Sequence, residues 1–451
     1  MSGISKVFVA NRGEIAVRIM TACREMGIET VLGVSEADRD SFAARMADRV
    51  VCIGPAQPLQ SYLRVETIIT AALGTGADAI HPGYGFLAEQ PELGEACANS
   101  GLIFIGPKPE NIRKMGDKLV AREIVKELGV PVIPGSELVH DFEEALLMAE
   151  KVGFPVLLKA AAGGGGKGMK MVKRPDDLKT LFEEASAEAR AAFGDDRIYI
   201  EHLISNARHI EVQILADRFG NIVHLFERDC SLQRRYQKMI EEAPSPAVSD
   251  DMREKICKAA VGIADHVKYE NAGTIETVLD QDQGQFYFLE MNTRIQVEHP
   301  VTEMITGKDL VKEQIRIAGG EPISFAQEAI AMKGHAIECR INAELPEADF
   351  RPSPGGITDW RPPEGNGIRV DSHCYSGYFV PPYYDSLLAK LIVKGDDRFQ
   401  ATERMGSALA QFTVTGVDTT IPFYQSLMKN PDYLKGKINT RWVEEVFLKE
   451  Y

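Results

Sequence analysis

The chain has 451 residues, of which 44% are hydrophobic and 26% charged, and a formal net charge of −15. This length predicts two to four domains, and the composition is ordinary for a globular protein. The acidic balance argues against nucleic-acid binding, and no apolar run approaches the roughly 20 residues that span a bilayer, so we expect no membrane partner. Seven scattered cysteines without a CxxC pair indicate free thiols in a cytoplasmic compartment.

The first segment alternates short apolar strands with helices. A strand at 6–10 precedes a helix in which Ile15 and Ile19 recur at helical spacing. The pattern predicts a parallel, doubly wound α/β domain that ends near Lys114. NRGE after the first strand holds one glycine, whereas a dinucleotide-binding fingerprint needs three. We therefore expect this domain to act as a structural platform and not to bind a dinucleotide. Tyr84, between two glycines in HPGYGFL, indicates either a functional loop or a plain turn.

A glycine-rich stretch dominates the next segment. A helix expected at 115–128 carries Lys118 near its start, where backbone amides favour anions. A strand at 155–159 ends in Lys159 and precedes AAAGGGGKGMKMV. No GK[ST] follows, so we predict a lid that folds over phosphates rather than a Walker A loop, with a flexible linker as the alternative. The four consecutive glycines are Gly163, Gly164, Gly165 and Gly166.

Polar and charged residues then recur on predicted strands. Residues 209–215 alternate strictly, with His209, Glu211 and Gln213 on one face. We expect this polar face either to line a nucleotide site or to be exposed to solvent. A strand at 222–226 leads into a cationic group that we expect in a loop, which either surrounds an anionic ligand or is solvated. Its members are Arg228, Arg234, Arg235 and Lys238.

Residues 274–300 are predicted to form a β-hairpin that carries acids. Two apolar runs flank the polar stretch 280–284, and a turn centred near Gln283 places Glu276 opposite Glu290. Asn292 falls on the same face as Glu290. Two carboxylates and an amide oxygen suit Mg²⁺ or Mn²⁺, although two solvated carboxylates on an open sheet face are the alternative.

A third region begins near residues 321–322. It comprises a strand at 335–344, proline- and glycine-rich turns, and helices at 398–412 and 421–428. On the strand, Arg340 shares a face with Glu338 and Asn342.

Taken together and in order, these motifs resemble biotin carboxylase, the ATP-grasp component of biotin-dependent carboxylases. The resemblance covers nearly the whole chain. It rests on ANRGEIAVR, HPGYGFL, MGDK, GGGGKGM, ERDCSLQRR, EMNTRIQVEHPVTE, GHAIECRINAE and PPYYDSLLAKLI. It implies an α/β and α+β architecture: a doubly wound parallel-sheet domain at 1–114, an ATP-grasp domain at 115–330 with a lid at about 131–204, and a C-terminal α+β domain at 331–451.

The resemblance also implies a role for each matching residue. Mg²⁺ or Mn²⁺ would be held by Glu276, Glu290 and Asn292. The nucleotide residues would be Lys118, Lys159, the four lid glycines, Met169, Glu201, His202, Leu203, Ile204, His209, Gln233, Tyr236, Glu276 and Glu290. Bicarbonate would meet Lys238, Arg294, Gln296 and Val297, with Arg294 and Lys238 also counted as catalytic. Glu298 would be the general base, Arg340 would stabilise the biotin enolate, and Tyr84 would lie near the biotin ring.

Two positions depart from the family pattern. His202 stands where a lysine is common, and Tyr236 where a histidine is usual. The His202 difference should have little effect on nucleotide binding if the hinge at 201–204 contacts adenine through its backbone. The second puts one nucleotide contact in doubt.

The implied reaction uses ATP and bicarbonate to carboxylate biotin through carboxyphosphate. In Ala331-Met332-Lys333-Gly334, the pattern around a biotinylated lysine is incomplete. We therefore expect biotin on a separate carrier protein, a further partner that supplies carboxyltransferase activity, and a homodimer. The acceptor stays open among acetyl-CoA, propionyl-CoA, pyruvate and 2-oxoglutarate. The competing hypotheses are another ATP-grasp ligase, such as one that forms carbamoyl phosphate, and an inactive scaffold protein.

Overall fold

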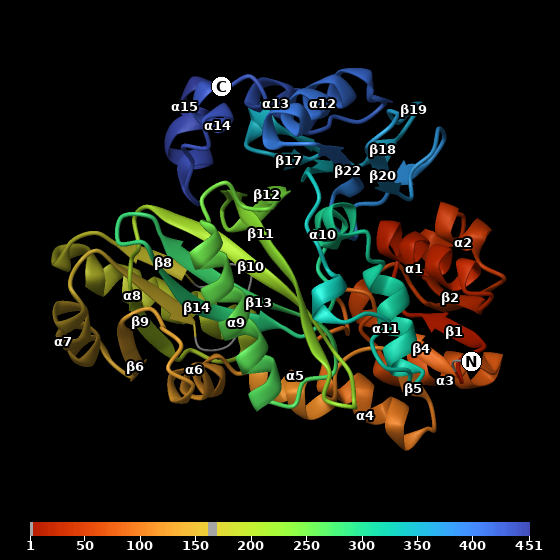
Figure 1. Ribbon diagram of the computed structural model, residues 1–451, viewed down its shortest axis with the longest axis horizontal. Coiled ribbons are helices and arrows are strands. Elements are labelled where there is room, and N and C mark those ends of the chain that lie inside the picture. The colour runs from red at the N-terminus through yellow and green to blue at the C-terminus, as the bar shows by residue number, and fades with distance from the viewer. Residues whose placement is uncertain (1–2, 161–168) are drawn as a thin grey trace.

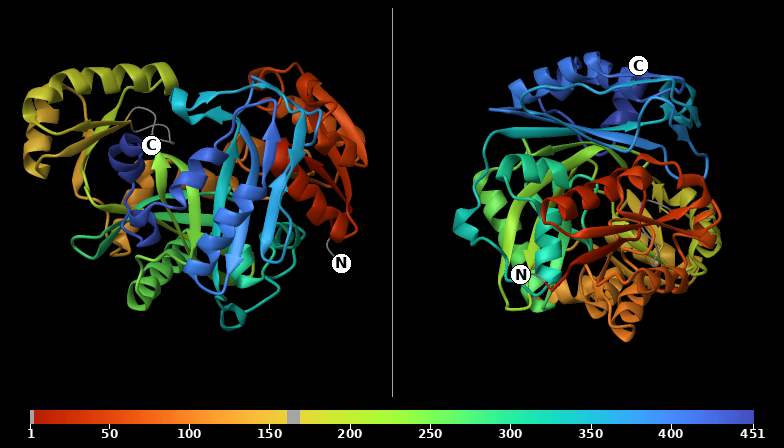
Figure 2. Two further views of the ribbon diagram at one scale, coloured as in Figure 1. Left: turned by 90° about the horizontal axis from the view of Figure 1, so that it is seen from above. Right: turned by 90° about the vertical axis from the view of Figure 1, so that its right-hand side faces the viewer.

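The computed structural model describes residues 3–160 and 169–451. The N-terminal domain, a lid and a large sheet with its helices are separate parts of the ribbon (Figure 1). Seen from above, the lid and the N-terminal domain lie at opposite ends of the molecule (Figure 2). The predicted lid glycines, residues 163–166, lie outside the described residues.

The N-terminal sheet is parallel, with strand order β3-β2-β1-β4-β5, which confirms the predicted doubly wound architecture. Val7 and Val9 pack into one core cluster with Ile15 and Ile19, while Phe8 packs into another, so both sheet faces are covered. The elements are β1 (Lys6–Val9), α1 (Gly13–Glu25), β2 (Glu29–Ser35), α2 (Phe42–Met46), β3 (Arg49–Gly54), α3 (Val65–Thr75), β4 (Ala79–His81), α4 (Pro91–Asn99), β5 (Ile103–Phe104) and α5 (Pro109–Gly116).

The helix predicted at 115–128 is α6 (Lys118–Glu127), which begins three residues later than predicted because Met115 and Gly116 end α5. Asp117 separates them in an extended conformation. Its carboxylate accepts hydrogen bonds from the backbone N–H groups of Leu119 (3.0 Å) and Val120 (3.1 Å), which caps α6. Lys118 is therefore the first residue of the new helix.

The lid is a four-stranded sheet of order β6-β9-β7-β8 with two helices packed on it. Its paired strands are antiparallel. Leu158, Ile200, Ala145 and Ala185 are fully buried between the sheet and the helices. The elements are β6 (Gly135–Val139), α7 (Phe142–Val152), β7 (Val156–Ala160), β8 (Met169–Val172), α8 (Leu178–Phe193) and β9 (Ile198–His202).

One eight-stranded sheet, of order β14-β13-β10-β11-β12-β15-β22-β20, runs through the segments predicted as the central and C-terminal domains. Strands β12 and β15 join the two segments by antiparallel pairing. The main elements are β10 (Ala207–Ala216), β11 (Ile222–Arg234), β12 (Gln237–Ala243), α9 (Asp250–His266), β13 (Asn271–Asp280), β14 (Gln285–Asn292), α10 (His299–Thr306), α11 (Leu310–Ala318), β15 (His335–Asn342), β20 (Ile368–Ser372), β22 (Leu387–Gly395), α12 (Arg398–Gln411), α13 (Ile421–Leu427), α14 (Pro431–Leu434) and α15 (Leu448–Glu450).

Short strand pairs complete the C-terminal segment. They are β16 (Glu344–Leu345) with β17 (Arg351–Pro352), β18 (Gly355–Gly356) with β21 (Phe379–Val380), and β19 (Asp359–Arg361) with β23 (Thr413–Thr415).

The prediction that the four cations lie in a loop is wrong, whereas an anionic ligand near them stays a prediction. Arg228 and Arg234 lie on β11 and Lys238 on β12, with Arg235 at the turn between these strands. Arg228 is fully buried and donates to Glu211 at 2.6 Å, whereas Arg234 and Arg235 both bind Asp349. Arg228 and Lys238 both pair with Glu211, whereas Arg234 and Arg235 pair with Asp349. These acidic partners allow the charged residues to lie on strands.

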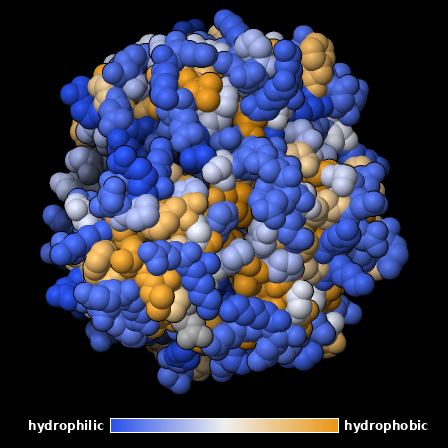
Figure 3. Space-filling model, turned by 90° about the vertical axis from the view of Figure 1, so that its left-hand side faces the viewer, coloured by the Kyte–Doolittle hydropathy of each residue, from blue (hydrophilic) through white to orange (hydrophobic). Residues whose placement is uncertain are grey.

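No helix among residues 3–160 and 169–451 is long and apolar enough to cross a membrane. The face of the molecule on the side of α7 is largely hydrophilic, with apolar side chains exposed in patches near its centre (Figure 3).

The ion pair of Glu242 generates a prediction about folding. Glu242, on β12, accepts hydrogen bonds from His335 of β15 (2.8 Å) and Arg398 of α12 (2.7 Å). Burial opposes its charge, but Arg398 and His335 outweigh burial and lower the pKa of Glu242 to about 2. Glu242→Gln leaves the buried His335 and the half-buried Arg398 without an anion, so the free energy of unfolding should fall by about 3–5 kcal/mol at pH 7.

Urea unfolding at several pH values measures this effect. The depressed pKa gives the wild type stability above about pH 4.5 that is lost as the pH falls towards 2, so the deficit of the variant should shrink in acid. Glu184→Gln removes an exposed partner of Lys170 and should cost under about 0.5 kcal/mol. Equal deficits in the two variants would contradict the assignment.

Candidate active site

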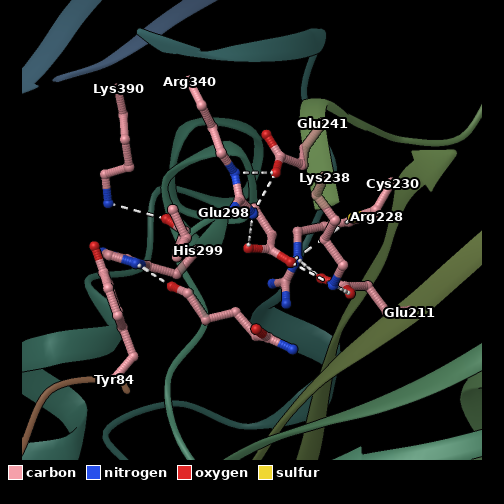
Figure 4. A network of polar contacts seen from close by, with 12 residues as sticks. Tyr84, Glu211, Arg228, Cys230, Lys238, Glu241, Glu298, His299, Arg340 and Lys390 are labelled. Atoms are coloured by element: carbon pink, nitrogen blue, oxygen red, sulfur yellow. Dashed lines mark hydrogen bonds and ion pairs between the residues drawn. The ribbon is translucent and has the colours of Figure 1, made fainter. Parts of the chain in front are cut away.

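Lys238 lies at the centre of a buried cluster of carboxylates. Its Nζ donates to Glu211 Oε2 at 2.6 Å, to Glu276 Oε1 at 2.8 Å and to Glu298 Oε1 at 2.7 Å. Each of the three glutamates is at most 5% exposed. We call Lys238 and these three glutamates the Lys238 cluster (Figure 4 shows Lys238 with Glu211 and Glu298).

Opposite charges keep this cluster ionised despite its burial. Burial opposes the charge of Lys238, but its three glutamates raise the pKa of the amine well above its usual range. Burial likewise opposes ionisation of Glu276, yet Lys238 and His209 lower its pKa to about 2. Burial alone would lower the pKa of His209, whereas Glu276, 3.3 Å away, raises it to about 9. Lys238, Glu276 and His209 are therefore charged at neutral pH.

The sheet register brings these charges together. Glu290, Glu276, Glu211 and Arg228 are consecutive partners across β14, β13, β10 and β11. The expectation that the polar face of 209–215 meets water is wrong, because both faces of β10 are buried. Helix α9 contacts β10 and β11, and α10 contacts β11 and β12.

Glu276 lies opposite Glu290, as the hairpin pattern predicts, but the turn alone does not produce this pairing. From Thr277 to Asp280, β13 pairs with Phe288 to Gln285, and a bulge between Glu276 and Thr277 then shifts the register by one residue. The bulge moves Glu290 to the position opposite Glu276. The alternative of two solvated carboxylates is wrong for Glu276, which is 5% exposed.

The residues predicted to hold a metal provide oxygen atoms that can serve as metal ligands, at the end of the hairpin away from its turn. Glu290 faces Lys118 at 3.3 Å, and Asn292 Oδ1 accepts from Arg294 Nη2 at 2.9 Å. Carboxylate and amide oxygens are ligands that Mg²⁺ and Mn²⁺ prefer, so this donor set fits either ion. His209, Glu211 and Glu276 form a second group whose ligand atoms lie within 4.8 Å of one another.

Charged residues form a row across the sheet, and Arg340 on β15 extends this row beyond Lys238 on β12. Its Nη2 donates to Glu298 Oε2 at 2.9 Å, and its Nε donates to Glu241 Oε1 at 2.7 Å (Figure 4). Glu298 precedes α10 and is completely buried. One oxygen of Glu298 therefore binds an ammonium and the other a guanidinium, which fixes the carboxylate in place.

The predicted bicarbonate residues meet at the same place. Arg294 is held by Glu89 (2.8 Å) and donates to Gln296 Oε1 (2.8 Å), while Gln296 Nε2 donates to Glu276 Oε1 (3.1 Å). The carbonyl of Val297 accepts from Lys390 at 2.9 Å.

The described nucleotide residues line the lid and the strands that face it. Lys159 Nζ donates to Glu201 Oε2 at 2.7 Å, and Arg122 binds the other oxygen of Glu201. Met169 pairs with Lys159 across β7 and β8. In the predicted hinge, the N–H groups of His202 and Leu203 donate to the carbonyls of Pro134 (2.8 Å) and Pro155 (3.1 Å), and Ile204 follows, 8% exposed.

Three further predicted residues lie near or beside the cluster. Gln233 is buried and donates to the carbonyl of Cys230 at 2.8 Å. Tyr236 is 46% exposed at the β11–β12 turn with φ of 63°, a left-handed conformation that is unusual for a bulky residue. Tyr84 donates to Glu14, whose other oxygen is 3.1 Å from Lys390.

The sequence did not single out four charged residues that complete the site: Glu14, Glu89, Glu241 and Lys390. Glu241 follows Lys238 by three residues in a strand that was read as a loop. Lys390 lies opposite Arg340 across β15 and β22. A buried lysine in the apolar run LLAKLIV was the only available signal for it.

Family models match three successive parts of the chain. Residues 3–112 match the N-terminal domain of biotin carboxylase, and residues 338–445 match its C-terminal domain. Residues 117–326 match the ATP-binding domain of the carbamoyl-phosphate synthase L chain.

Curated relatives match over nearly the full length. A biotin carboxylase of Nostoc sp. is 55% identical over 442 residues, which cover 98% of this chain and 99% of the relative. A biotin carboxylase of Bacillus subtilis is 51% identical over 442 residues, with coverage of 98% of each chain.

Solved structures share the whole fold. The biotin carboxylase domain dimer of the Hydrogenobacter thermophilus 2-oxoglutarate carboxylase, in complex with MgADP, ADP and bicarbonate, is 48% identical with a TM-score of 0.95, over 98% of this chain and 97% of the other. A biotin carboxylase of Campylobacter jejuni, in a β-γ-ATP complex, is 45% identical with a TM-score of 0.96, over 98% and 99%.

The Lys238 cluster predicts how stability depends on pH when its cation is removed. Lys238→Gln leaves three buried carboxylates without their shared ammonium, so the free energy of unfolding in metal-free buffer should fall by about 3–5 kcal/mol at pH 8. In the wild type, Lys238 keeps the pKa of Glu276 near 2, whereas the variant carboxylates should take up protons on acidification. The deficit should therefore shrink as the pH falls from 8 to 5. A deficit that grows in acid would contradict this account.

Proposed function

Because the chain belongs to the biotin carboxylase family, it carries out the ATP-dependent carboxylation of biotin, and we propose that the residues gathered around Lys238 perform this reaction. The observation that carries the assignment is the position of Glu298. Lys238 and Arg340 bind its two oxygens at 2.7 and 2.9 Å, between the predicted bicarbonate and biotin residues. A carboxylate held between two cations can accept a proton in a defined direction.

Glu298 removes the proton of bicarbonate in this proposal. Lys238, Arg294 and Gln296 surround the anion, and its arrival displaces part of the present hydrogen bonding between Lys238 and the glutamates. The deprotonated oxygen then attacks the γ-phosphorus of ATP, which forms carboxyphosphate and releases ADP. The fixed charges of Lys238 and Arg294 stabilise the negative charge that develops.

ATP lies between the lid and the hairpin in this proposal. Lys118 and Lys159 meet the phosphates, together with the lid glycines, and the hinge at 201–204 meets adenine. Glu276, Glu290 and Asn292 would hold Mg²⁺ or Mn²⁺. When bound, the ion neutralises charge on the phosphates. Closure of the lid excludes water from the intermediate.

Arg340 acts on biotin. Carboxyphosphate breaks into carbon dioxide and phosphate, and the phosphate takes the N1′ proton of biotin. Arg340 then stabilises the negative ureido oxygen by a charge-assisted hydrogen bond, with Tyr84 beside the ring. The nitrogen attacks carbon dioxide and forms carboxybiotin.

The partners follow from this chemistry. We propose that biotin arrives on a separate carrier protein, that a carboxyltransferase subunit uses the carboxybiotin, and that the chain forms a homodimer. The seven cysteines are free, which supports a reducing, cytoplasmic compartment. We also propose the three domains 1–114, 115–330 and 331–451, with the lid at about 131–204.

Two substitutions test the catalytic roles. Glu298→Gln removes the base, and Arg340→Ala removes the cation that stabilises the ureido oxygen. Each should lower kcat for biotin-dependent ADP formation about 100-fold or more, measured by a coupled assay with free biotin. Glu364→Gln, an exposed loop variant, is the matched control and should be unaffected. Near-normal turnover in Glu298→Gln or Arg340→Ala would refute the corresponding role.

The hairpin acids predict a metal-binding defect. Glu290→Gln removes one carboxylate ligand and should weaken Mn²⁺ binding in the presence of ADP about tenfold or more, measured by electron paramagnetic resonance. The same variant should keep its fold, because Glu290 is partly exposed. Unchanged Mn²⁺ affinity would place the ion elsewhere.

A further inference from the structure

Two glutamates beside Arg340 have no part in the steps above, although they are among the most deeply buried charged residues of the molecule. Glu241, on β12, and Glu338, on β15, are both 0% exposed. They are direct partners in the antiparallel register of these strands. Directly opposed side chains share one face of the sheet, with β-carbons about 5 Å apart. We call these two residues the acid pair.

The acid pair lacks the hydrogen bonds that two ionised carboxylates require. Among the described residues, neither oxygen of Glu338 has a hydrogen-bond partner, and Glu241 Oε2 has none. Glu241 Oε1 accepts from Arg340. A buried carboxylate without donors is strongly disfavoured in the ionised form, whereas a neutral carboxylic acid needs one acceptor. Glu241, directly opposite on the same face, has one oxygen available as such an acceptor.

The neighbouring cations do not neutralise Glu338. Lys390, which lies opposite Arg340 across β15 and β22, donates a hydrogen bond to the carbonyl of Val297 (2.9 Å) and forms an ion pair with Glu14 (3.1 Å). Arg340 binds Glu241 and Glu298. Lys238, the remaining cation near Glu241, is held by its own three glutamates. The charged residues that face the acid pair from β12, β15, β22 and the start of α10 are thus already paired with counterions other than Glu338.

We propose that Glu241 and Glu338 share one proton and act together as positioning residues for Arg340. Glu241 holds the guanidinium through Nε, and Glu338 stays neutral, so no further anion competes with Glu298 for Arg340. This inference rests on the proposed function, because it assigns Arg340 to the biotin enolate. The guanidinium then keeps the positive charge that the ureido oxygen needs when Glu298 takes a proton from bicarbonate.

The direction of both pKa shifts agrees with this geometry. Burial raises the pKa of Glu338 well above its usual range, and Lys390 reduces that rise only in part. Burial also raises the pKa of Glu241, to about 7, against the opposing effect of Arg340. Glu241 therefore gives up its proton first, and Glu338 keeps the proton that remains.

A shared proton has a consequence for folding that does not involve turnover. The unfolded chain releases the proton of Glu338 above about pH 4.5, whereas the folded chain retains it. Each unit of rising pH therefore shifts the wild-type equilibrium about tenfold towards the unfolded state, until the folded pair also ionises. Glu338→Gln has no such proton and escapes this loss.

Thermal unfolding of the full chain between pH 6 and 9 tests the pair. The melting temperature of Glu338→Gln minus that of the wild type should increase with pH, whereas the difference for the control Glu364→Gln should stay constant. Infrared spectra of the wild type at pH 9, where Glu241 has given up its proton, should contain the carbonyl band of a buried protonated carboxylic acid, and Glu338→Gln should lack it. A melting difference independent of pH, or a spectrum without the band, would overturn the proposal.

Steady-state kinetics test the positioning of Arg340. Glu241→Gln should lower kcat for biotin-dependent ADP formation about tenfold with the KM for ATP unchanged, since it removes one charge-assisted bond to the guanidinium. The pH above which kcat declines should be higher in Glu338→Gln than in the wild type. A rise in KM alone, or an unmoved alkaline limb, would overturn the positioning role. A wild type that shows the infrared band but no biotin-dependent ADP formation would contradict the proposed function while supporting the proton pair.

Discussion

The buried ammonium of Lys238 is the interaction on which the site depends. Three carboxylates that are almost wholly removed from water bind one cation at 2.6 to 2.8 Å. An isolated buried carboxylate would take up a proton and lose its charge, so these residues can serve as anions only while Lys238 and its neighbours compensate them. The same requirement holds along the whole charged row, where Arg228 compensates Glu211 and Arg340 compensates Glu298 and Glu241.

A continuous sheet makes this compensation possible. Residues from six neighbouring strands, β13 to β22, contribute to one row of charges, although they are far apart in the sequence. Strand β12 carries both Lys238 and Glu241 and pairs with β15, so the cation for bicarbonate and the guanidinium for biotin are fixed relative to each other. Helix α10 covers this part of the sheet, and Glu298, just before the helix, reaches both cations. The lid and the N-terminal domain then lie on either side of this row.

The sequence predicted those features that depend on local pattern. The hairpin acids followed from two apolar runs and a polar turn, although the bulge that pairs Glu276 with Glu290 was not foreseen. The motifs in their order also identified the family. Predictions failed where a charged residue takes its partner from a distant segment: Arg228 and Arg234 were read as a loop because Glu211 and Asp349 could not be recognised as their counterions. For the same reason the burial of Glu338 and Lys390 was not predicted, since it depends on the pairing of β12, β15 and β22.

Following the carbon of isotopically labelled bicarbonate tests the central claim most directly. The purified chain, incubated with ATP, Mg²⁺, labelled bicarbonate and free biotin, should produce labelled carboxybiotin in an amount equal to the ADP released. Addition of ammonia should not divert the label. Formation of ADP with an unlabelled biotin fraction, or the appearance of labelled carbamoyl phosphate when ammonia is present, would contradict the role given to Glu298 and Arg340 and would favour a different ATP-grasp ligase.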